Sequence, residues 1–70
     1  NSFSAMFDLA ESEMRLDKNN DAKATLLRAL EVYRKSNDQK KSDVLRHMKQ
    51  SGPLQPLLDD TEIKAALEGL

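Results

Sequence analysis

The chain has no cysteine and no tryptophan, and among its 70 residues there are only one histidine, one tyrosine and two phenylalanines. Without cysteine there is no disulfide framework, no thiolate nucleophile and no cysteine-based zinc site, and an intracellular, cytoplasmic location is favoured. There are only two glycines and two prolines, and they form no Gly-rich phosphate loop. We therefore expect a protein that is not an enzyme and that holds no cofactor or metal.

Long hydrophobic runs are also missing. No apolar segment approaches the roughly 18 residues that a membrane span needs, and no basic segment precedes a short apolar one, so no signal peptide is expected. A chain of 70 residues suits one domain, 1–70, and not two. The chain begins at Asn1 rather than Met. This leaves open whether residues 1–5 are native and whether the domain was excised from a longer protein.

The formal net charge of −1 conceals a pattern along the chain. Residues 1–22 carry two positive and five negative side chains, a net charge of −3. Residues 23–49 carry eight positive and three negative ones, a net charge of +5, and residues 50–70 carry one and four, again −3. The basic middle can lie against the acidic ends of its own chain or attract an acidic partner, and the intramolecular interpretation is favoured.

The first predicted helix, about residues 1–16, carries a wide apolar arc. Its main stripe recurs at helical spacing and consists of Phe3, Met6, Phe7, Ala10 and Met14. Leu9 and Leu16 lie off this stripe, so the arc covers nearly half of the helix and is wide enough to contact more than one neighbour. Ser2 and Ser4 are the candidate N-caps.

The strongest helix pattern follows over residues 21–36, after a turn predicted at residues 18–21. Its apolar stripe consists of Ala22, Leu26, Ala29, Leu30 and Tyr33. Arg34 and Lys35 place positive charge at its C-terminal end, where the helix dipole favours it. A break at Ser36–Asp38 separates this helix from the next.

Two shorter helices are predicted in the remainder. The third, about residues 39–50, has a narrow stripe and ends at Gly52 followed by Pro53. That stripe consists of Val44, Leu45 and Met48. The fourth begins with a capping box, with Asp59 as N-cap and Glu62 at the third helical position, and with a hydrophobic staple. The staple joins Leu58 to Ile63, and the apolar stripe continues with Ala66, Leu67 and Leu70. The fold class predicted is all-α, a small four-helix domain.

The first two helices together resemble one tetratricopeptide (TPR) repeat over about residues 4–33. The family's large-large-small apolar set on the first helix is matched by Met6, Leu9 and Ala10. Its second helix, in which small alanines let the helices approach closely, is matched by Asp21, Ala22, Leu26, Ala29, Leu30 and Glu31. The chain departs from the family at Glu13, where an aromatic residue is preferred, and at Asp17, where the turn glycine is usual. The resemblance implies a TPR-like antiparallel hairpin followed by two shorter helices.

In TPR proteins the first helix of a repeat lines a concave groove that binds peptides. Transferred by the resemblance, the groove positions are Ser4, Phe7, Asp8, Glu11, Met14 and Arg15. Phe7 and Met14 would form an apolar floor, and Asp8 and Glu11 an acidic rim. An amphipathic helix with basic flanks would suit such a surface. The other interpretation is that Phe7 and Met14 are ordinary core residues.

A second resemblance is to three-helix modules of the microtubule-interacting-and-trafficking type. These modules share the residues around Asp17 and Ala22 and also bind helices between their own helices. The fourth predicted helix fits that family less well.

Three short sequence patterns give weaker indications of function. Residues 17–21 resemble the start of a calcium loop, but Ala22 occupies the place of the required glycine and Arg28 that of the bidentate glutamate. Leu54–Leu58 matches an LxxLL pattern, but Pro56 disfavours a continuous helix, so we expect an extended connector that places its leucines on the core. His47 has no second histidine or cysteine with which to form a metal site, and a solvated role is favoured.

We therefore predict a protein-interaction module, such as an adaptor, a small chaperone or a regulatory subunit. It would bury apolar residues on a partner helix, on a peptide or on an identical chain, with charge setting the register. The alternative is a small nucleic-acid-associated regulator that uses the basic segment 34–49. A low sequence pI of about 5.7 and few aromatics for base stacking make nucleic acid the less favoured partner.

Overall fold

The computed structural model describes residues 3–35 and 41–69, and at residues 41–43 it describes the backbone alone. The chain folds into α1 (Phe3–Arg15), α2 (Asn19–Lys35), α3 (Lys41–Gln50), a short 3₁₀ helix η1 (Gln55–Asp59) and α4 (Thr61–Glu68). No strand occurs within the described residues. The all-α fold with four helices is therefore confirmed. The predicted N-cap Ser2, the break at Ser36–Asp38 and the apolar Leu70 lie outside the described residues.

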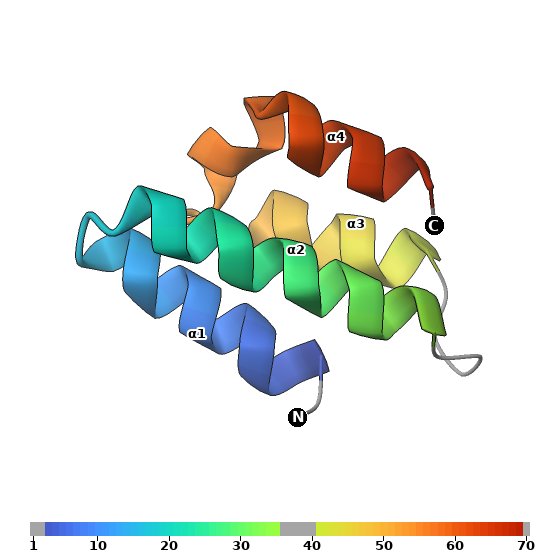
Figure 1. Cartoon of the computed structure of the whole chain (residues 1–70), viewed down its shortest axis with the longest axis horizontal. Coiled ribbons are helices and arrows are strands. Elements are labelled where there is room, and N and C mark those ends of the chain that lie inside the picture. Colours follow the sequence, from blue (N-terminus) through green and yellow to red (C-terminus); the bar gives the residue numbers. More distant parts are fainter. Residues whose placement is uncertain (1–2, 36–40, 70) are drawn as a thin grey trace.

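Helix α2 is the centre of the molecule. Figure 1 shows α1 antiparallel to it on one side, α4 across the other side, and α3 behind it. The whole apolar stripe predicted for α2 is buried, namely Ala22, Leu26, Ala29, Leu30 and Tyr33. A helix with neighbours on several sides needs a wide buried face, and small alanines within that face let the adjacent backbones approach closely.

The other elements each contribute side chains to one core. From α1 come Phe7 and Ala10, and from α3 come Val44 and Met48. The C-terminal third contributes Leu54, Leu57, Ile63 and Leu67. Two leucines do not join this core, because Leu9 is 53% and Leu16 is 65% exposed. The wide apolar arc predicted for α1 is thus only partly covered.

The turn between α1 and α2 is shorter than predicted. Asp17 has a φ of 60°, and this left-handed residue ends α1 in a Schellman arrangement. The Lys18 N–H donates to the Glu13 carbonyl at 2.8 Å and the Asp17 N–H to the Met14 carbonyl at 3.1 Å. Because one residue reverses the chain, α2 already begins at Asn19, and the prediction of a turn over residues 18–21 was wrong. Ser4 was also wrong as an N-cap, since it lies within α1.

The end of α3 is capped differently from the prediction. No described glycine has a positive φ, so Gly52 does not form the left-handed cap that often ends helices. The Gln55 side-chain amide instead donates to the carbonyls of Met48 at 3.1 Å, Lys49 at 3.0 Å and Ser51 at 3.1 Å. Of these acceptors, the carbonyls of Met48 and Lys49 belong to the last turn of α3, where regular helical partners are missing, and that of Met48 also accepts from the Ser51 N–H at 3.3 Å.

The connector after α3 is a 3₁₀ helix, not the extended segment predicted. Pro56 lies near its start, where a missing N–H removes no helical hydrogen bond. Leu54 and Leu57 are buried, as expected for leucines placed on the core, and Leu58 is half-buried. The 3₁₀ helix moves the start of α4 by one residue.

The N-cap of α4 is Asp60 and not Asp59 as predicted. The Asp60 Oδ1 atom accepts hydrogen bonds from the backbone N–H groups of Glu62 at 2.9 Å and Ile63 at 3.2 Å. Because Asp59 still belongs to η1, it has no place at the helix start. The local pattern of two consecutive aspartates fitted either register, and the preceding turn of 3₁₀ helix decides between them.

The acidic C-terminal segment packs against the basic middle at one lysine. Lys23 Nζ of α2 lies 3.1 Å from Asp60 Oδ2 and 2.9 Å from Glu62 Oε1. This contact supports the intramolecular interpretation of the charge pattern. Within the described part of the chain, no helix is long and apolar enough to cross a membrane.

Candidate functional site

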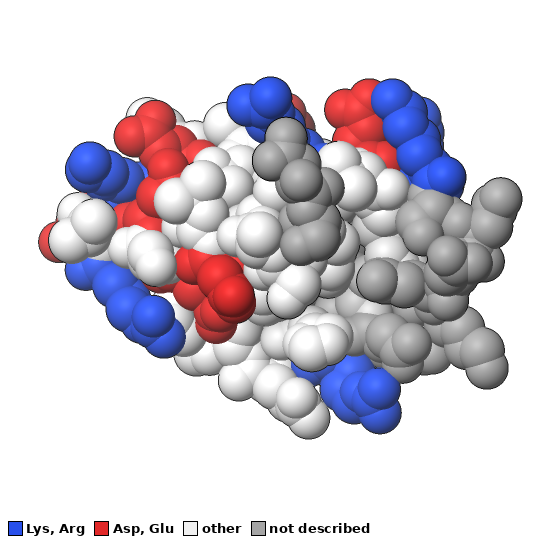
Figure 2. All heavy atoms as spheres, turned by 90° about the horizontal axis from the view of Figure 1, so that it is seen from below, with Lys and Arg blue, Asp and Glu red and all other residues white. Residues whose placement is uncertain are grey.

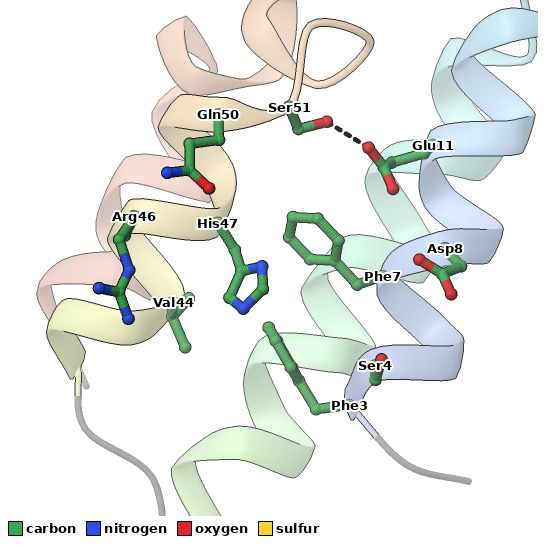
Figure 3. Close-up of a pocket in the computed structure, with 10 residues that line it drawn as sticks. All are labelled: Phe3, Ser4, Phe7, Asp8, Glu11, Val44, Arg46, His47, Gln50 and Ser51. Carbon is green, nitrogen blue, oxygen red and sulfur yellow. Dashed lines mark hydrogen bonds between the residues drawn. The ribbon is translucent and has the colours of Figure 1, made fainter.

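A groove of about 500 Å³ lies between α1 and α3. It is lined from α1 by Phe3, Ser4, Phe7, Asp8 and Glu11 and from the α3 side by Val44, Arg46, His47, Gln50 and Ser51. Figure 3 shows the two rows facing each other across the opening. The volume falls in the range of about 300–1,000 Å³ typical of ligand-binding clefts. The groove is the site on which we concentrate.

Helical periodicity places the α1 wall. Ser4, Phe7, Asp8 and Glu11 recur at spacings of three and four residues, so they share one side of the helix. Phe7 is 6% exposed and belongs to both the core and the groove floor. Asp8 is exposed and Glu11 is half-buried. The predicted groove positions Ser4, Phe7, Asp8 and Glu11 are therefore brought together in one cleft.

Met14 and Arg15, the other two predicted positions, do not line this groove. Met14 is half-buried and packs against the core, as the alternative interpretation expected of it. Arg15 is exposed in the last turn of α1. The apolar floor is instead supplied by Phe3, Phe7 and Val44, so the groove extends along the first two-thirds of α1 only.

The floor of the groove is aromatic. The Phe3 and Phe7 ring centroids are 5.6 Å apart, and Phe3 is also 5.6 Å from Tyr33 of α2. The His47 imidazole meets Phe7 edge-on at 5.8 Å. These separations fall in the range of about 4.5–7 Å in which aromatic pairs are favourable. The edge-on contact between Phe7 and His47 joins the two walls, and the half-buried Phe3 ring presents apolar surface to a ligand.

One end of the groove is closed by a polar contact between its walls. The Ser51 hydroxyl donates to the Glu11 carboxylate at 2.6 Å, as the dashed line in Figure 3 shows. Ser51 is only 6% exposed, and a short charge-assisted hydrogen bond of this kind is stronger than one between neutral groups. The contact links α1 to the end of α3 and sets the distance between the walls there.

The α1 edge of the groove is acidic. None of the cations that the structure describes lies within ion-pair distance of Asp8 or Glu11. The opposite wall carries Arg46 and the uncharged amide of Gln50. The two edges thus differ in charge, and a ligand with a cationic side meets a favourable potential in one orientation only.

Sequence reasoning missed the α3 wall. His47 was assigned a solvated role; the residue is exposed, but its ring contacts Phe7 inside the groove. Val44, which is 1% exposed, was predicted as a stripe residue and not as part of a groove floor. Phe3 was likewise assigned to the core stripe. The apolar stripes of α1 and α3 were the sequence signal for this wall. They do not indicate on which side of α2 the third helix lies.

Across residues 3–35 and 41–69, no group of three or more potential ligands is placed to hold a metal ion. The calcium-like segment forms the turn at Asp17 and the first turn of α2.

Comparison of the chain with known protein families, with curated proteins and with solved structures gives no match. The groove between α1 and α3 is therefore the feature of the molecule that bears on its function.

Proposed function

We propose that this chain is a non-enzymatic protein-interaction module that binds an amphipathic helix of a partner protein in the groove between α1 and α3. An adaptor, a small chaperone or a regulatory subunit would use such a module. A cytoplasmic location is part of the proposal, in keeping with a chain that contains no cysteine.

The observation that carries the proposal is the combination of an aromatic floor with an acidic edge. Phe3 and Phe7 offer apolar surface, and Asp8 and Glu11 stand one helical turn apart along the edge. A helix that inserts a leucine or phenylalanine over the floor and a lysine or arginine toward this edge would match both features. The partner chemistry proposed is therefore a cationic amphipathic helix.

The arrangement of the helices also supports the proposal. The groove lies between α1 and α3. In a TPR-like chain, α1 would be the first helix of one hairpin and α3 the first helix of the next. In that family the first helix of each repeat lines the peptide groove. Asp17, at the position where the family usually has glycine, has the left-handed φ of 60° that a glycine favours. A left-handed residue at this turn supports the proposed likeness to a TPR hairpin.

The nucleic-acid alternative has weaker support. The described cations of its segment are divided between two helices, Arg34 and Lys35 on α2 and Arg46 and Lys49 on α3. Lys35 also lies 3.4 Å from Glu31 of its own helix. On the face seen in Figure 2, acidic and basic side chains alternate around the described surface without forming one basic field. Duplex binding usually needs a concentrated basic patch.

The proposal is tested with a fluorescent helical peptide that presents leucines on one face and lysines on its flanks, beside the same peptide with glutamates in place of the lysines. Fluorescence anisotropy should show tighter binding of the lysine peptide. Asp8→Lys should weaken that binding roughly fivefold, as expected of a rim charge. Glu68→Lys changes the charge equally on α4, away from the groove, and should leave the affinity unchanged.

Nuclear magnetic resonance locates the binding surface. Addition of the lysine peptide should shift the backbone amide signals of Ser4, Asp8, Glu11 and Gln50. If neither peptide binds, the proposed function is wrong. If Asp8→Lys and Glu68→Lys weaken binding equally, the attraction is a general effect of charge and the groove is not the site.

A further inference from the structure

The face of α1 that points away from the core carries a second uncovered apolar stripe. Among the residues that the structure describes, two large hydrophobic side chains are exposed, Leu9 at 53% and Leu16 at 65%. Leu16 follows the last residue of α1, and its N–H donates to the Ser12 carbonyl at 3.2 Å, so it continues the helical path. The two leucines are seven positions apart, which places them on one side of the helix.

Small side chains complete this stripe. Ala5, Leu9, Ser12 and Leu16 are all exposed, and their spacings of four, three and four residues are those of a coiled-coil stripe. None of the four is charged. The side of α1 that carries them is distinct from the groove, and Figure 2 shows this face of the molecule, with uncharged side chains lying between acidic and basic ones.

Charges along one edge of the stripe are self-complementary. Asp8 precedes Leu9 and Arg15 precedes Leu16, so the acidic and the basic residue also stand seven apart on one edge. Both are exposed, and no described residue forms an ion pair with either. In an antiparallel pair of identical helices, this edge faces the same edge of the other helix.

We propose that α1 pairs with α1 of a second copy of this chain in an antiparallel, two-fold symmetric dimer. In this antiparallel register Leu9 of each copy packs against Ser12 of the other and Leu16 against Ala5, so that each leucine meets a small side chain. Asp8 then lies two residues, about 3 Å along the helix axis, from Arg15 of the second copy, a distance that the long arginine side chain spans. Two-fold symmetry forms each of these contacts twice. A short helix that has an acidic residue beside one leucine and a basic residue beside the other is therefore complementary to its own copy.

The dimer is weak, because a single 13-residue helix covers less than the roughly 1,000 Å² expected of a stable interface. Sedimentation velocity from micromolar to millimolar protein concentration should show a mass that rises toward that of the dimer. Leu9→Glu and Leu16→Glu should each remain monomeric at the highest concentration, with an unchanged helical circular dichroism spectrum since both positions are exposed.

Exchanging the charges of Asp8 and Arg15 distinguishes this dimer from nonspecific association. Asp8→Arg alone should weaken association roughly tenfold through two equivalent pairs, and the double change Asp8→Arg with Arg15→Asp should restore it. A protein that is monomeric at every concentration overturns the proposal, and so does a double variant that associates no better than the single one. Leu9→Glu should leave binding of the lysine peptide unchanged, which separates this surface from the groove.

Discussion

A single carboxylate performs two tasks at the start of α4. The Oδ1 atom of Asp60 caps the helix, while its Oδ2 atom lies 3.1 Å from Lys23 Nζ. The adjacent Asp59 has the same side chain one residue earlier but belongs to η1. The two residues therefore form a matched pair for a stability measurement.

We predict that Asp60→Ala lowers the melting temperature by several degrees, because a helix loses its cap and an ion pair together. Asp59→Ala should change it by much less. Thermal unfolding followed by circular dichroism at neutral pH compares the two variants directly. Equal effects, or a larger effect at Asp59, would show that the N-cap lies one residue earlier.

At the scale of elements, Lys23 is the charged link between α2 and α4. The ammonium group donates to Glu62 and Asp60 and its pKa is raised above the ordinary value of 10.5, chiefly by those hydrogen bonds. The same lysine, helped by the two backbone N–H groups, lowers the pKa of Asp60 below 3.8, although partial desolvation opposes this. Both shifts favour the charged pair in the folded state.

The stability of the fold should therefore decrease at both acid and alkaline pH. The contribution of the Asp60 carboxylate to the stability of the fold is present above pH 3.8 and is lost as the pH falls through the lower pKa of the folded state. The contribution of the Lys23 ammonium group is present below pH 10.5 and is lost as the pH rises through the higher pKa of the folded state. Urea unfolding should show a smaller loss of stability at acid pH in Lys23→Gln than in the wild type. Lys64→Gln on α4 is the control and should keep the acid dependence.

The stripe of α2 could be predicted in full, because five apolar positions at helical spacing have only one way to share a face. The α4 register could not, since Asp59 and Asp60 both satisfy local capping rules and the choice depends on η1. The half of the groove that contains Phe7, Asp8 and Glu11 was among the positions transferred from the TPR resemblance. The half supplied by α3 depends on how the chain crosses behind α2, which no local pattern encodes.

At the scale of the whole molecule, stability depends on a small core centred on α2. The radius of gyration is 10.9 Å, close to the roughly 11 Å expected of a compact chain of this length. A domain this small has only about 3–5 kcal/mol of stability from its core. Leu26, with no exposed surface, contacts the interior of that core.

We predict that Leu26→Ala costs about 2–4 kcal/mol and leaves much of the protein unfolded at room temperature. Leu16→Ala removes the same atoms from a side chain that is 65% exposed, and should change stability by less than about 0.5 kcal/mol. Urea titration at low protein concentration, where α1 pairing does not contribute, measures both. Similar losses in the two variants would contradict the placement of the core.

The position of α2 between α1 and α4 also orders the assembly of the fold. Residues of the α1–α2 hairpin are near neighbours in sequence, so its contacts close short loops and form quickly. The contact of Lys23 with Glu62 joins residues 39 positions apart, and such closure costs more chain entropy. We therefore expect helix α4 to dock after the α1–α2 hairpin has formed and to detach before that hairpin opens. Its amide protons should exchange with solvent through partial openings that leave the hairpin intact.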